Sequence, residues 1–284
     1  MPSENLPMFE WNQETIASMQ SSDFEGAKHE LNQGLERLKG MLRAGQAENA
    51  RYADEGQDLD ELFPGPTIFA SLTPLPHNTR SAAFVMCTKA FTAVPQVLPA
   101  SRNHVNDENA RIAGTKSPKT DKLAEATMWS CVTSYNLGLC HHLRAMSSSG
   151  NTSDDLDAGM LAYRHTLSLI YPWQEEPSYM LLYLAALNND CHIQFQRLGR
   201  GEFQQESPEG NPQCPRTQGS NQQQSSMVDD TPGSTLEQIG ILLSRMKRVL
   251  EDIQTIDNEI TPDPSYRQEV AFFRQNLTAA LGFG

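Results

Sequence analysis

Regular three- and four-residue spacing of apolar side chains is the feature that most constrains how this chain can fold. Four long segments carry it, at about 123–146, 156–170, 177–198 and 236–253. The last segment has apolar residues at Leu236, Ile239, Leu243, Met246, Leu250 and Ile253. This spacing places the apolar side chains on one face of an α-helix. The sequence therefore predicts an all-α fold whose helices bury one face against each other.

Shorter helical patterns occur at both ends of the chain. Residues 8–43 read as two helices around Ser21–Asp23, and 264–281 read as a last helix closed by Gly282. A capping box, Ser234–Glu237, begins the helical segment at 236–253. We therefore expect an N-terminal helix pair at 8–43, a helical core at 121–200 and a C-terminal pair at 233–284 packing on the core.

Two stretches of different composition separate these helical regions. Residues 44–120 contain seven prolines and two strand-like runs, 67–72 and 83–92, rich in β-branched and aromatic residues. The runs predict a small antiparallel β pair, a β-hairpin insertion packed on the helices. Polar residues dominate 103–119, and Gln and Ser dominate 201–232. Neither stretch has an apolar face, so both are expected to be disordered loops.

Charge narrows the range of partners. Among 284 residues, 35 are acidic and 22 are basic, which gives a net charge of -13. An acidic chain repels phosphate backbones and anionic lipid, so nucleic acid and membrane are not expected as partners, whereas a basic protein segment is favoured. The N-terminus shows no leader pattern, and the five cysteines form no CxxC pair. These features predict a cytoplasmic or nuclear protein with reduced thiols.

The sequence lacks GxGxxG, GxxxxGK[ST], HExxH and GxSxG. It therefore predicts no enzyme activity and no cofactor. One metal hypothesis remains open, in which Cys140, His142, Cys191 and His192 converge from two neighbouring helices as zinc ligands. Their spacing argues against it, because neighbouring residues on a helix diverge by about 100°. Packing accounts for the four residues instead, and no metal site is expected.

Three segments resemble the tetratricopeptide repeat. Residues 23–35 resemble its second helix, with Ala27 and Gly34 at the small positions. Residues 135–142 resemble its first helix, with Leu137-Gly138 at the Leu-Gly pair, and 187–195 echo the same helix. The chain is also similar to repeat-like proteins expanded in diatoms. The resemblance implies stacked antiparallel helix pairs, a solenoid that binds other proteins.

The physics of such a stack assigns roles to particular residues. Gly138, Gly159 and Ala27 would let paired helices approach closely, while the first helices of successive pairs would line a concave surface. Three asparagines lie on those first helices: Asn136, Asn188 and Asn189. Their amides offer a paired donor and acceptor to the backbone of an extended peptide.

Basic side chains stand on or near the same helices. Arg144, Arg164 and His165 would meet a carboxylate-rich partner, and Arg144 joins the three asparagines as an expected partner-binding residue. The sequence thus predicts a non-catalytic interaction module or scaffold that holds a partner segment around 121–146 and 177–198. The alternatives are a metal protein or enzyme using the Cys/His cluster, and a structural subunit of an assembly.

Overall fold

The computed structural model describes eight stretches of the chain, in which helices predominate. They are residues 8–52, 67–70, 84–94, 118–147, 152–171, 177–200, 235–257 and 264–282. The expected loops at 103–117 and 201–232 lie outside these residues. No helix in the described stretches combines the length and apolar composition that a bilayer span requires.

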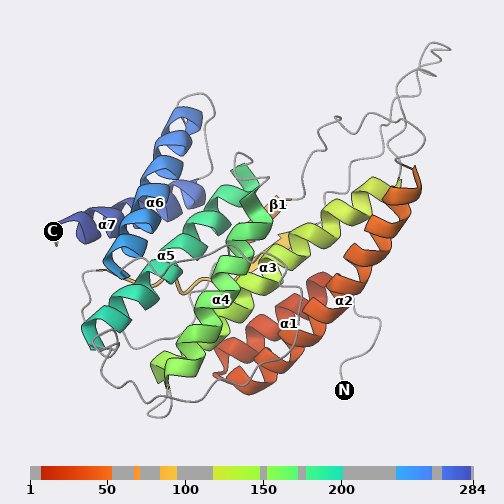
Figure 1. Ribbon diagram of the computed structural model, residues 1–284, viewed down its shortest axis with the longest axis horizontal. Helices are drawn as coiled ribbons and strands as arrows, with labels where there is room; N and C mark the ends of the chain where they lie inside the picture. The colour runs from red at the N-terminus through yellow and green to blue at the C-terminus, as the bar shows by residue number, and fades with distance from the viewer. Residues whose placement is uncertain are drawn as a thin grey trace, which may run out of the picture.

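The helices follow one another in a row in which each packs on the next (Figure 1). In chain order they are α1 (Met8–Gln20), α2 (Phe24–Tyr52), α3 (Pro118–Ser147), α4 (Thr152–Ile170), α5 (Pro177–Arg200), α6 (Thr235–Asp257) and α7 (Pro264–Leu281). Their apolar faces join in one buried cluster that runs from Trp11 in α1 to Ala280 in α7. The mostly helical fold that the apolar spacing predicts is confirmed.

The turn between α1 and α2 is the one expected at residues 21–23. Ser22 adopts a positive φ of 64°, and the carboxylate of Asp23 accepts a hydrogen bond from the Gly26 N–H at 3.0 Å, which caps α2. The Trp11 ring then packs directly on Gly34, where a Cβ would lie 2.2 Å from the ring. A glycine is therefore needed where α1 meets α2.

Glycines also set the contact between α3 and α4. A Cβ on Gly138 would lie 2.8 Å from the Tyr163 ring and 3.1 Å from the Gly159 carbonyl oxygen. A Cβ on Gly159 would in turn lie 3.2 Å from the Gly138 carbonyl oxygen. The close approach expected from these two glycines is present, and it brings Tyr163 into the core beside α3.

Two helix boundaries differ from the sequence expectation. Helix α2 continues past residue 43 to Tyr52, because 44–52 are mainly good helix formers even though they carry no apolar stripe. Helix α3 begins at Pro118, the first-turn position in which a proline is tolerated, so it takes in residues assigned to the loop. Apolar spacing alone detects neither extension.

The β structure is a short antiparallel pair of β1 (Thr67–Ala70) and β2 (Phe91–Val94). Thr67 lies opposite Val94 and Ala70 lies opposite Phe91. The strand-like run at 83–92 enters this ladder only at its end, since residues 85–90 form no strand. Residues 84–94, here named the crossing segment, instead lie across several helices and pass behind α5 and α3 in Figure 1.

Candidate functional site

Five asparagines hold the backbone of the crossing segment. They come from four different helices and are Asn12 of α1, Asn136 of α3, Asn188 and Asn189 of α5, and Asn276 of α7. All are buried, and Asn12, Asn136, Asn188 and Asn189 have no exposed surface. We name these five residues the asparagine clamp.

Three clamp residues each bind both backbone groups of one segment residue. The Asn136 amide oxygen accepts the Phe91 N–H at 3.0 Å, and its nitrogen donates to the Phe91 carbonyl at 2.8 Å. Asn189 binds Cys87 in the same way, at 2.8 and 2.9 Å. Asn276 does so for Val85, at 3.2 and 2.6 Å. The expected pairing of one amide with a peptide's donor and acceptor is therefore present, but its ligand is a segment of this chain.

The other two clamp residues reinforce the ends of the segment. Asn188 donates to the Val85 carbonyl at 3.0 Å, and Asn12 donates to the Phe91 carbonyl at 3.0 Å. Clamp residues also bind each other, since Asn136 donates to Asn12 at 3.1 Å and Asn276 donates to Asn188 at 2.8 Å. The buried amides thus form two hydrogen-bonded groups, one at each end of the segment, and their polar atoms find the partners that buried polar groups require.

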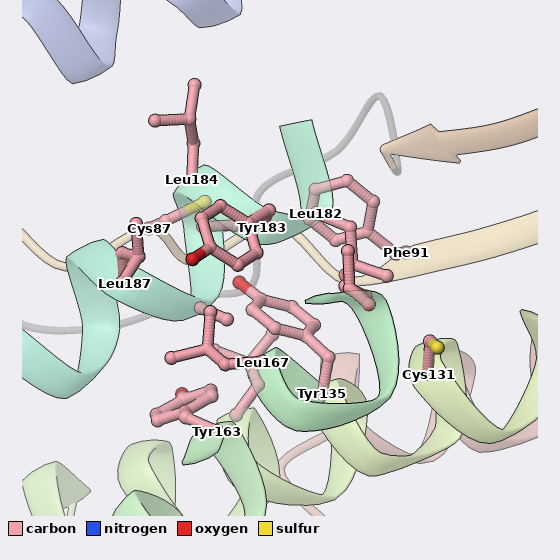
Figure 2. Packing of buried hydrophobic residues seen from close by; sticks show 14 of the residues in the cluster. Cys87, Phe91, Cys131, Tyr135, Tyr163, Leu167, Leu182, Tyr183, Leu184 and Leu187 are labelled. Atoms are coloured by element: carbon pink, nitrogen blue, oxygen red, sulfur yellow. The ribbon is translucent and has the colours of Figure 1, made fainter. Parts of the chain in front are cut away.

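Side chains of the crossing segment fill the apolar space between clamp residues. Phe91 meets Tyr135 edge-on, with ring centroids 5.0 Å apart, and Phe84 packs against His192 and Phe195. Met86 and Cys87 are also buried. Figure 2 shows Cys87 and Phe91 among aromatic and aliphatic side chains of α3, α4 and α5. The segment is part of the core of the molecule.

Two tyrosine hydroxyls form hydrogen bonds with the clamp residue Asn189. The Asn189 amide nitrogen lies 3.2 Å from the Tyr135 hydroxyl and 3.1 Å from the Tyr163 hydroxyl. Both tyrosines are buried, and burial raises the pKa of each hydroxyl well above its ordinary value. They therefore stay neutral and available for hydrogen bonding at physiological pH.

The four cysteine and histidine residues of the metal hypothesis do not converge on one point, although the two histidines meet. The Cys140 thiol faces the Phe24 carbonyl at 3.2 Å, whereas His142 lies 3.1 Å from His192, on another side of α3. Within the described residues, no three Cys, His, Asp or Glu side chains form a group able to hold a metal. A two-residue step rotates a side chain by about 200° around a helix, which explains the separation of Cys140 from His142.

The buried thiols are poor nucleophiles. Burial raises the pKa of Cys87 to about 11, and the pKa of Cys131, Cys140 and Cys191 to about 12. A thiol reacts as its thiolate, which is scarce for these residues at neutral pH. Their arrangement does not support thiol catalysis.

Arg144 does not reach the crossing segment. Its guanidinium donates to Asp155 at 2.6 Å and pairs with Glu25, while His141 lies 2.9 Å from the same Asp155. Burial alone would raise the pKa of Asp155, but the bonds from His141 and Arg144 outweigh burial and lower it. Arg144 thus links α3 to α4 and α2, and a role in partner binding stays a prediction.

Arg164 and His165 lie on the outer side of α4. Arg164 points toward α5 and α6, where it contacts Asp190 and Gln238. His165 is exposed, and partial burial of its ring, with a smaller effect of Lys39, lowers its pKa. Neither residue contacts the clamp in the described structure.

Sequence reasoning found three of the five clamp residues and missed Asn12 and Asn276. The signal for both was a polar residue inside an apolar face, since Asn12 follows Trp11 and Asn276 lies between Phe273 and Leu277. A buried asparagine in such a position needs partners, which points to a backbone in contact with it.

Comparisons with known proteins add no relative. No protein-family model matches the chain, and neither a curated protein nor a solved structure shows significant similarity to it. The proposals below therefore rest on the geometry of the molecule.

Proposed function

We propose that this chain is a non-catalytic interaction module, a stack of antiparallel helix pairs that holds an extended segment of another protein. The partner segment takes the place that residues 84–94 occupy in this structure. One observation carries the proposal: four of the five clamp residues lie on α1, α3 and α5, the first members of three successive helix pairs, and the fifth lies on α7. First helices line the concave surface in solenoids of helix pairs, which is where such proteins bind their partners.

The clamp bonds support recognition of a backbone more than of a particular sequence. The eight hydrogen bonds between clamp and segment all go to main-chain groups of Val85, Cys87 and Phe91. Any segment in the same conformation presents the same donors and acceptors. Side-chain preference then comes from the apolar sites that Phe84 and Phe91 fill.

Charge adds a preference for a basic residue. Lys89 of the crossing segment pairs with Glu269 of α7, which is mostly buried in that contact. A partner with Lys or Arg at the matching position would keep this pair. The net charge of -13 would attract a basic segment over longer distances.

The energetics of the crossing segment allow exchange. Ordering eleven residues costs about 10–20 kcal/mol of conformational entropy. Burial of Phe84, Met86 and Phe91 together with eight net hydrogen bonds contributes roughly 10–20 kcal/mol. Because the two amounts are similar, the open clamp stays accessible, and a competing segment that makes the same contacts must also offset the cost of association in trans.

Competition in trans tests the proposal. A fluorescent peptide with the sequence of residues 82–95 is titrated with the full chain, and binding is followed by fluorescence anisotropy. Phe84→Ala in the chain loosens one end of the crossing segment without changing the clamp. We expect this variant to bind the peptide at least tenfold more tightly than the unmodified chain, because a larger fraction of the clamp is open.

Two controls make the result specific. Adding Asn136→Ala to Phe84→Ala should abolish binding, and so should N-methylation of the peptide at Phe91, which removes the N–H that Asn136 accepts. Phe9→Ala, an exposed change elsewhere on α1, should leave the affinity unchanged. If a folded Phe84→Ala chain binds no peptide, the clamp serves only to build the fold, and the chain is better described as a structural subunit.

A further inference from the structure

A hollow of about 720 Å³ opens between α4, α5 and α6. Helices α4 and α6 each pack on α5 and lie on either side of it (Figure 1). Arg164 of α4 and Arg245 of α6 line the two walls, and Tyr183 and Asp190 of α5 line the floor. No residue of the asparagine clamp lines this hollow.

The charged groups of the hollow do not balance. Arg164 donates to the Asp190 carboxylate at 3.3 Å and to the Gln238 amide oxygen at 3.1 Å, so it spans from α4 to α6. Arg245 forms neither a hydrogen bond nor an ion pair with the residues that the structure describes. Two guanidinium groups thus face one carboxylate, which leaves a positive charge in a strongly acidic protein.

The negative charge of Asp190 is also disfavoured by its position. Asp190 is 1% exposed, and burial raises the pKa of its carboxyl although Arg164, Gln194 and Arg245 oppose this. The positive excess in the hollow is therefore at least one full charge. A ligand that brings its own carboxylate would compensate it, and a guanidinium fork binds a carboxylate through two parallel hydrogen bonds.

The rest of the lining is apolar or aromatic. Leu167 and Leu242 are nearly buried, while Tyr171 and Ile241 stand at the surface with 66% and 47% of their area exposed. Exposed aromatic and aliphatic side chains beside the Arg245 guanidinium form a surface suited to an amphipathic anion. The volume is in the range of small-molecule sites.

We infer that the hollow between α4, α5 and α6 binds a carboxylate carried on an apolar body. Arg245 binds the carboxylate, Arg164 and Gln238 close one side of it, and the apolar body rests on Leu167, Tyr171 and Ile241. Two sources supply this chemistry, a free carboxylic acid and the C-terminus of a peptide. The inference does not depend on the proposed function, because it uses a different surface.

A matched pair of small probes tests the inference on the full chain. Methyl groups of Ile and Leu are labelled with ¹³C, and 3-phenylpropionate or its neutral amide is added in increasing concentration. We expect the acid to shift the Ile241 and Leu242 methyl signals to saturation, with at least tenfold weaker binding of the amide. Equal effects of acid and amide, or no saturable shift with the acid, would overturn the inference.

Variants locate the charge that matters. Arg245→Gln should weaken binding of 3-phenylpropionate at least tenfold, whereas Arg248→Gln, an exposed change on α6 that does not line the hollow, should leave it unchanged. Retention of full affinity by Arg245→Gln would overturn the assignment. A peptide ending in a free Phe carboxylate is the second probe. Tighter binding than 3-phenylpropionate would support the site with a peptide terminus as its source, and weaker binding would support it with a free acid.

Discussion

Asn189 and Asp190 are neighbours on α5, yet their side chains serve different regions of the molecule. Asn189 lies in the asparagine clamp, where it binds both backbone groups of Cys87. Asp190 lies at the floor of the hollow between α4 and α6, where it meets Arg164 at 3.3 Å. A step of one residue turns about 100° around a helix, which is enough to place the two side chains against different neighbours.

The two regions differ in how their polar groups are satisfied. In the clamp, neutral amides meet neutral backbone groups of the crossing segment, and most contacts lie between 2.6 and 3.2 Å. In the hollow, charged groups meet imperfectly, and Arg245 has no ion-pair partner in the described part of the chain. The polar groups of the clamp are thus satisfied within the chain, whereas in the hollow Arg245 has no described side chain within ion-pair distance.

Removal of an amide from the clamp should have the largest effect. Asn189→Ala leaves the Cys87 N–H and carbonyl buried without their partner and takes a neighbour from the Tyr135 and Tyr163 hydroxyls. We expect the free energy of unfolding to fall by about 3–5 kcal/mol, measured by urea denaturation followed by circular dichroism. Asn32→Ala, at an exposed position of α2, should change it by no more than about 0.5 kcal/mol. A loss below about 1 kcal/mol for Asn189→Ala would mean that the clamp is not what stabilises this region.

Sequence reasoning reached the helices and part of the clamp for a definite physical reason. Apolar spacing reports which face of a helix is buried, so it located α3 to α7 and the small residues Gly138 and Gly159. On the same faces, Asn136, Asn188 and Asn189 stand out as polar residues among apolar ones. Spacing carries no information on what lies against a face, and the ligand of the clamp was therefore expected to be another protein.

The hollow was beyond reach of sequence patterns for a related reason. Arg245 and Gln238 lie on α6, while Arg164 and Asp190 lie on α4 and α5, so the site exists only through the packing of three helices. Arg164 was noted as a basic residue for a carboxylate-rich partner, but its neighbours across the hollow could not be read from the chain. Helix α2 past residue 43 was missed because it has propensity without an apolar stripe.

A glycine-to-alanine change should destabilise the fold at the α3–α4 contact and stabilise it on α6. Gly138→Ala places a Cβ 2.8 Å from the Tyr163 ring, which supports the clamp, and should destabilise the fold by about 1–3 kcal/mol. Gly240→Ala lies on α6, where no atom is within 4 Å of the added Cβ, and should stabilise it by about 0.5–1 kcal/mol through helix propensity. Thermal and urea denaturation of both variants measure the difference. The comparison fails if Gly138→Ala is as well tolerated as Gly240→Ala.

The smallest effect is expected for Asp190→Asn, and it should depend on pH. Burial raises the pKa of Asp190 in the folded state above its unfolded value, so the stabilising contribution of the protonated carboxyl is present below about pH 4 and is lost as pH rises through the raised pKa. Asparagine does not ionise, so the variant avoids that loss of stability, but it also loses the ion pair with Arg164. We therefore expect Asp190→Asn to change the free energy of unfolding by no more than about 1 kcal/mol at pH 7. The stability of the variant relative to the unmodified chain should be higher at pH 7 than at pH 4. Urea denaturation at both pH values measures this, with the exposed Asp252→Asn on α6 as the control. If Asp190→Asn is instead less favourable at pH 7 than at pH 4, Arg164 and Arg245 stabilise the carboxylate more than burial destabilises it, and the excess positive charge of the hollow is one rather than two.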